Sequence, residues 1–188
     1  MKQINLPSHL FVQKSTGLAP HDITAAAAQT NDAHENRKRV ILCGLFVERE
    51  IEAIIGYYLY PGTAVSEQQA FVAGEILGSD ALTFNHKKRL VMSLVNKKKW
   101  LEGEAKNDFE GGLKRVISFR NAFTHGNIIV RDSIPVLEYF EGGQKKCDLT
   151  DEYWTRVEND FNAVVEQIEA IKLAAGMPRP QGLEGPSQ

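Results

Sequence analysis

Three polar residues near the middle of the chain have the types and spacing needed for phosphoryl-transfer chemistry. They are Arg120, Asn121 and His125. A histidine can move protons near neutral pH, and a planar guanidinium suits a phosphate group. Asn121 and His125 are four residues apart, so they share one face of a helix. Arg120 and His125 are about 140° apart around the axis, so the long arginine side chain must swing to share a site with the histidine.

The residues before this motif predict a helix over residues 104–125. Its apolar positions follow spacings of four, three and one, which mark one helix face: Phe109, Leu113, Val116, Ile117. Arg120 continues this inward stripe, so it needs a partner, because an unpaired buried charge is unfavourable. Gly126 follows His125, as a glycine follows the last turn of many helices. Gly111 and Gly112 allow either a kink or close packing of the same helix.

The order Arg120-Asn121-x-x-x-His125 resembles the R-[polar]-x3-H signature of the HEPN superfamily (higher eukaryotes and prokaryotes nucleotide-binding domains). The resemblance covers roughly residues 31–175. It implies an all-α bundle that carries the motif near the end of a late helix. Many members are metal-independent endoribonucleases, often toxins or antiviral defence proteins. The resemblance therefore implies catalytic roles for Arg120, Asn121 and His125.

Two functions remain open from the sequence. In the first, the ribose 2′-hydroxyl of RNA attacks the adjacent phosphate, His125 transfers a proton as base or acid, and Arg120 stabilises the phosphoryl oxygens. This reaction needs no metal or other cofactor, because the nucleophile belongs to the substrate. One histidine cannot readily make both proton transfers, so we expect a homodimer with the two motifs near its two-fold axis.

The alternative is a non-catalytic regulatory or partner-binding module that resembles the mannitol operon repressor class. Arg120 would then form a structural ion pair, and His125 would cap its helix. A third possibility is a toxin that a nucleotidyltransferase-type antitoxin silences. That partner is implied by the resemblance alone.

Positive charge is concentrated just before the motif, although the whole chain has a net charge of −2. Residues 86–120 contain ten Lys or Arg and only four Asp or Glu. A basic segment of this kind suits an RNA-facing surface. The candidate RNA-binding residues are Lys87, Lys88, Arg89, Lys114 and Arg115. Ordinary solvated helix faces explain the same charges equally well.

The periodicity of the 188-residue chain predicts one domain of about five helices with a small β-hairpin. We expect helices over residues 31–60, from 66, from 80 to about 99, over 104–125 and from 151 to about 175. Residues 127–149 are β-rich, and Gly142-Gly143 predicts a hairpin turn just before the last helix. That helix has apolar residues at alternating steps of three and four, which suit bundle packing or a dimer seam. Residues 1–30 are expected to be an N-terminal arm, and residues 176–188 a disordered tail.

The sequence lacks the patterns typical of a metal site, a secreted protein or a membrane span. Cys43 and Cys147 are the only cysteines and have no metal-ligand spacing, so we expect a reducing, cytoplasmic location and no metal site. The first residues lack the apolar core of a signal peptide. No stretch approaches the roughly 20 apolar residues of a membrane span. We therefore expect no membrane partner.

Overall fold

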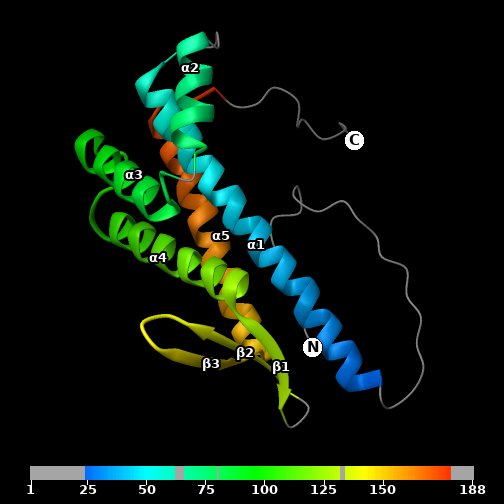
Figure 1. The fold of residues 1–188 in the computed structure, drawn as a ribbon. Helices are drawn as coiled ribbons and strands as arrows, with labels where there is room; N and C mark the ends of the chain where they lie inside the picture. Colours follow the sequence, from blue (N-terminus) through cyan, green and yellow to red (C-terminus); the bar gives the residue numbers. More distant parts are fainter. Residues whose placement is uncertain (1–23, 62–65, 80, 132–133, 179–188) are drawn as a thin grey trace, which may run out of the picture.

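The computed structural model describes residues 24–61, 66–79, 81–131 and 134–178 (Figure 1). Within these ranges the chain forms five α-helices, one π-helical segment and three strands. Their order is α1 (Thr24–Leu59), α2 (Glu67–Phe71), η2 (Val72–Leu77), α3 (Phe84–Lys98), α4 (Gly103–His125), β1 (Asn127–Arg131), β2 (Ile134–Phe140), β3 (Gln144–Asp148) and α5 (Asp151–Ala174). The predicted helical class and the hairpin before the last helix are confirmed.

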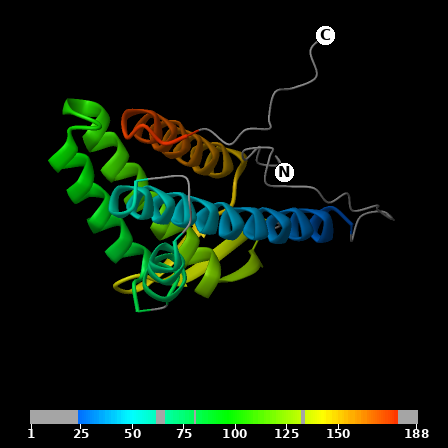
Figure 2. The ribbon, with the colours of Figure 1, turned by 90° about the horizontal axis from the view of Figure 1, so that it is seen from above.

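The long helix α1 is central, as its apolar sequence predicts. It contacts α3, α4, α5 and the sheet, and it lies beside α5 in both ribbon views (Figures 1 and 2). Its core residues include Val40, Val47 and Ile51, which are fully buried. The helix begins at Thr24, not at residue 31 or 32. Alanines at 25–28 favour helix, so the chain is already helical within the predicted arm. Residues 1–23 of that arm and 179–188 of the predicted tail lie outside the described residues.

The segment between α1 and α3 differs most from expectation. Ser66 caps α2 in a capping box with Gln69, so the helix predicted from residue 66 begins there. The helix then continues as the π-helical η2. Phe71 and Ile76, which the apolar pattern places inside, are 58% and 42% exposed. The helix expected from residue 80 begins at Phe84, where the Thr83 side chain accepts a hydrogen bond from the His86 N–H.

Helices α4 and α5 pack closely through a glycine. A β-carbon at Gly112 would lie 2.6 Å from Cγ2 of Val164, so a larger side chain would separate the two helices. Close packing, not a kink, is therefore the role that the structure gives Gly112. The apolar stripe of α5 is fully buried in the same chain: Trp154, Val157, Phe161, Val164, Ile168, Ile171. Of the two predicted uses of this stripe, bundle packing is the one observed.

The small sheet follows the motif helix directly. Strands β2 and β3 form the predicted hairpin, with Phe140 opposite Gln144, and Gly142 and Gly143 adopt positive φ in its turn. Strand β1 adds a third antiparallel strand beside β2. Gly126, which joins α4 to β1, has an extended backbone and not a left-handed one. Glycine fits there because a β-carbon would lie 2.4 Å from the carbonyl oxygen of Ala122. No helix in the described ranges is both long and apolar enough to cross a membrane.

Candidate functional site

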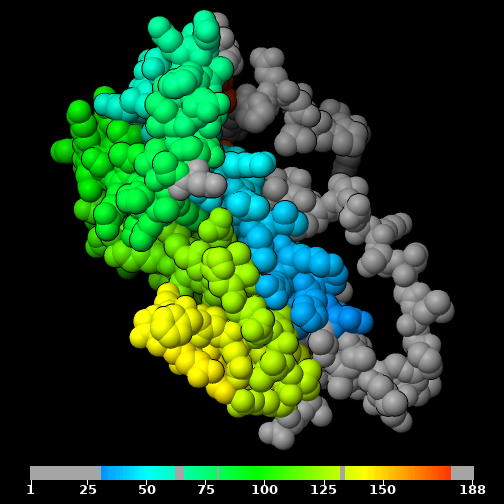
Figure 3. All heavy atoms as spheres, in the orientation of Figure 1, coloured from blue at the N-terminus to red at the C-terminus, as the bar shows by residue number. Residues whose placement is uncertain are grey.

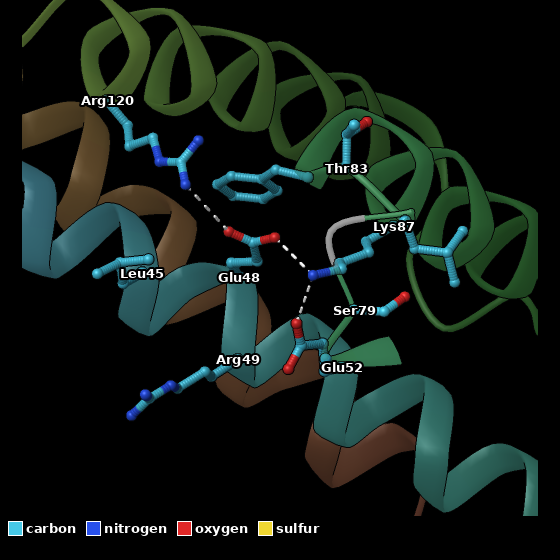
Figure 4. A pocket seen from close by; sticks show the side chains of 11 residues that line it. Leu45, Glu48, Arg49, Glu52, Ser79, Thr83, Lys87 and Arg120 are labelled. Carbon is cyan, nitrogen blue, oxygen red and sulfur yellow. Dashed lines mark hydrogen bonds and ion pairs between the residues drawn. The ribbon is translucent and has the colours of Figure 1, made fainter. Parts of the chain in front are cut away.

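Arg120 packs across α1 through a gap that a glycine provides. The helices α1 and α4 cross at Gly44, where a β-carbon would lie 2.8 Å from Cβ and 2.7 Å from Cγ of Arg120. The guanidinium then reaches Glu48 of α1, with Nη2 3.8 Å from Oε2 (Figure 4). The predicted partner for this inward arginine therefore comes from the central helix.

A lysine from α3 completes an ion-pair cluster made of Glu48, Glu52, Lys87 and Arg120. Nζ of Lys87 donates to Oε1 of Glu48 and to Oε1 of Glu52, each at 2.6 Å. Lys87 is only 4% exposed. Burial lowers its pKa, but hydrogen bonds and charge attraction from the two carboxylates outweigh burial and raise the pKa above its usual value. The lysine is thus held as an ammonium between two helices.

A cleft of about 440 Å³ opens beside this cluster. All four cluster residues line it, together with Arg49 from α1 and the hydroxyl side chains of Ser79 and Thr83 (Figure 4). His125 and Asn121 are not part of its wall. The arginine of the motif therefore faces a polar cleft, while the histidine lies elsewhere on α4.

Arg120 also contacts Asn121, the second residue of the motif. Nη1 of Arg120 donates a hydrogen bond to Oδ1 of Asn121 at 3.3 Å, while Nη2 of the same guanidinium faces Glu48. Asn121 and His125 are both exposed and share a helix face. His125 is the last residue of α4, and among the described residues its side chain makes no hydrogen bond or ion pair. No such contact joins it to Arg120 either. The arginine thus swings toward the histidine's face, as expected, but only as far as Asn121.

A second arginine, which the motif does not include, contacts the C-terminal end of α4 from helix α1. Nη2 of Arg37 in α1 donates to the carbonyl oxygen of Thr124 at 3.3 Å. This carbonyl is one of the helix-end acceptors that lack a partner inside the helix. Arg37, Gly44 and Glu48 are spaced by seven and four residues, so they form one stripe of α1 that faces α4. That spacing is the sequence signal that could have revealed Arg37.

The five candidate RNA-binding residues do not form one exposed basic surface. Lys87 belongs to the ion-pair cluster, and Lys88 is also buried. Burial, then the positive charge of Lys114, lowers the pKa of Lys88. Nζ of Lys114 pairs with Glu110 at 2.8 Å, and Nε of Arg115 pairs with Asp160 at 2.8 Å. Arg89 is exposed. Only Arg89, Lys114 and Arg115 therefore offer their charges near solvent, two of them already paired.

Within the described ranges, no three His, Cys, Asp or Glu side chains gather where they could hold a metal ion. Comparison of the chain with protein-family models, with curated proteins and with solved structures found no match.

Proposed function

We propose that this protein is an RNA endonuclease whose site is Arg120, Asn121 and His125 at the end of α4. The observation that carries the proposal is the hydrogen bond from Nη1 of Arg120 to Asn121. It directs part of the guanidinium toward the helix face that also bears His125. A phosphate-binding group is thereby turned toward the helix face of a proton-transfer group.

The arrangement assigns a role to each group in cleavage. The 2′-oxygen attacks the adjacent phosphorus and loses its proton, while the bond from phosphorus to the 5′-oxygen breaks and that oxygen gains a proton. His125 makes one of these proton transfers. Arg120 stabilises the charge on the phosphoryl oxygens, since its donors are fixed before the reaction begins. The products are a 2′,3′-cyclic phosphate and a 5′-hydroxyl, and the nucleophile comes from the substrate.

The proposal includes an RNA partner, a homodimer and, for a toxin, a nucleotidyltransferase-type antitoxin. The exposed Arg89, Lys114 and Arg115 would carry RNA contacts, because salt-sensitive phosphate binding needs cations near solvent. The ion pairs of Lys114 with Glu110 and of Arg115 with Asp160 are partly exposed and weak enough to exchange for phosphate.

One observation favours the alternative of a non-catalytic regulatory or partner-binding module. Arg120 pairs with Glu48 inside a cluster that ties α1, α3 and α4 together, which is the structural role that this alternative assigns to it. The same contact is compatible with catalysis, because an arginine held by one carboxylate retains donors for a phosphate. The two functions differ in what His125 does.

The experiment is incubation of the purified protein with a mixed RNA pool, with and without a chelator, followed by analysis of the RNA ends. We expect cleavage in both samples, with 2′,3′-cyclic phosphate ends. Intact RNA with a correctly folded protein would favour the binding module. Cleavage that disappears with the chelator would show that the reaction needs a metal.

A further inference from the structure

One contact between α1 and α4 lies one helix turn from a second exposed histidine, His34. Nη2 of Arg37 donates to the carbonyl oxygen of Thr124, the residue just before His125. The two helices run antiparallel here, since Gly44 of α1 packs on Arg120 of α4, further along α1 but earlier along α4. The space-filling view shows α1 and the end of α4 packed side by side (Figure 3).

His34 lies one turn before Arg37 on α1. Residues three apart on a helix are surface neighbours, with β-carbons about 5–6 Å apart. His34 is rotated about 60° from Arg37 to one side, and Val40 is rotated about 60° to the other side. Val40 is fully buried, and His34 is exposed. His34 therefore lies on the open side of the seam between α1 and α4.

The same reasoning places His125 on that side. Phe123 and His125 flank Thr124 and are rotated about 100° from it in opposite directions. Phe123 is fully buried, whereas His125 is exposed. Since an antiparallel helix pair shares one core side and one open side, both histidines border the open side of the seam. Each lies next to one partner of the Arg37–Thr124 contact.

We infer that His34 is the second proton-transfer residue of the cleavage reaction, so that one chain contains both an acid and a base and proton transfer does not require the two motifs of a homodimer to meet. This inference rests on the proposed function. One histidine takes the proton of the 2′-hydroxyl as this oxygen bonds to phosphorus. The other gives a proton to the 5′-oxygen as the bond from phosphorus to that oxygen breaks. The hydrogen bond of Arg37 to the Thr124 carbonyl would hold the two helices together while both rings act on one scissile phosphate.

The test compares His34→Ala and His125→Ala, with His86→Ala as the matched control. His86 is an exposed histidine at the start of α3, where Nδ1 contacts Oγ1 of Thr83 at 3.1 Å. We expect each of the first two variants to lose about 10²–10⁴-fold in cleavage rate, because each lacks one proton transfer. The control should cleave at the wild-type rate. All three side chains are exposed, so circular dichroism should show an unchanged fold.

A modified RNA separates proton transfer from a merely structural role. A substrate with sulfur in place of the 5′-oxygen has a thiol leaving group, whose pKa is far below that of an alcohol (about 8.5 for the cysteine thiol), so this group leaves without a general acid. We expect this RNA to restore the rate of one alanine variant and not of the other. Restoration of both, or of neither, would overturn the assignment.

Mixing the two variants tests whether the histidines act within one chain. Each chain in the mixture lacks one histidine, so we expect the mixture to cleave as slowly as the single variants after co-refolding. Recovered activity would mean that His34 and His125 act across a dimer, contrary to the inference. Full activity of His34→Ala alone would reject His34 while leaving the proposed nuclease intact. A wild-type protein that leaves all RNA uncut would reject the nuclease and the role of His34 together.

Discussion

Gly44 and Arg120 are in such close contact that no other residue type fits opposite the arginine without movement. A β-carbon on Gly44 would lie 2.8 Å from Cβ and 2.7 Å from Cγ of Arg120, and these are the least mobile atoms of that side chain. The position of the guanidinium, between Glu48 and Asn121, therefore depends on a glycine in another helix. This relationship links the central helix of the fold to the proposed site.

Gly44→Ala should displace Arg120, destabilise the fold and slow RNA cleavage. Overpacking a close contact typically costs about 1–3 kcal/mol. Gly56→Ala in the same helix is the matched control, because a β-carbon there meets nothing within 4 Å. That control should be stabilised by about 0.5–1 kcal/mol, since alanine is the better helix former. Denaturant unfolding measures both, and equal free-energy changes in the two variants would contradict the close contact.

Lys87→Met should destabilise the protein strongly, because it leaves Glu48 and Glu52 without their shared cation. Removing one partner of a buried ion pair costs about 3–5 kcal/mol. Lys114→Met is the control. Its pair with Glu110 is on the surface, so it should change stability by about 1 kcal/mol or less. Similar losses for both variants would show that Lys87 is not held in a buried cluster.

The stabilisation from Lys87 should also depend on pH at the alkaline end. The pKa of Lys87 is raised in the folded protein: burial lowers it, but its bonds to Glu48 and Glu52 raise it by more. The contribution is therefore complete below the ordinary lysine value of 10.5 and is lost as the pH rises through the higher folded-state pKa. Unfolding free energies of wild type and Lys87→Met should converge above that pH. A constant difference up to the alkaline limit of the fold would contradict the shift.

The two thiols should differ sharply in reactivity. Burial raises the pKa of Cys43 to about 12, so at pH 8 almost none of it is thiolate, the reactive form. Cys147 is half-buried, and burial raises its pKa as well. With an aromatic disulfide reagent at pH 8, we expect one thiol to react slowly in the folded protein and two to react in denaturant. Rapid reaction of both thiols in the folded protein would place Cys43 outside the core.

The elements that the sequence predicts well are those whose pattern is local. The steps of three and four in α5 alone identify its buried face, and Gly142-Gly143 identifies the hairpin turn. Lys87 is different, because a lysine beside Lys88 and Arg89 has the pattern of a solvent face. It turns inward because Glu48 and Glu52, on another helix, supply its counter-charges. No local periodicity contains that information.

In the candidate site, too, the sequence predicts the features that are local to one helix and misses those that depend on contacts between helices. The spacing of Asn121 and His125 on one helix follows from helical geometry, and so does the need of Arg120 for a partner. The identity of that partner depends on how α1 crosses α4, through Gly44 and Glu48. The spacing of Arg37 from Gly44 and Glu48 places it on the same stripe of α1, but its contact with Thr124, 87 positions away, follows only from the folded chain.

The most direct test of the central claim is the cleavage rate of wild type and of His125→Ala on one RNA, each with folding checked by circular dichroism. We expect wild type to cut the RNA to a 2′,3′-cyclic phosphate. We expect His125→Ala, which removes an exposed side chain, to stay folded and to cut about 10²–10⁴-fold more slowly. Equal cleavage rates for the two proteins, or no cleavage by a folded wild type, would contradict it.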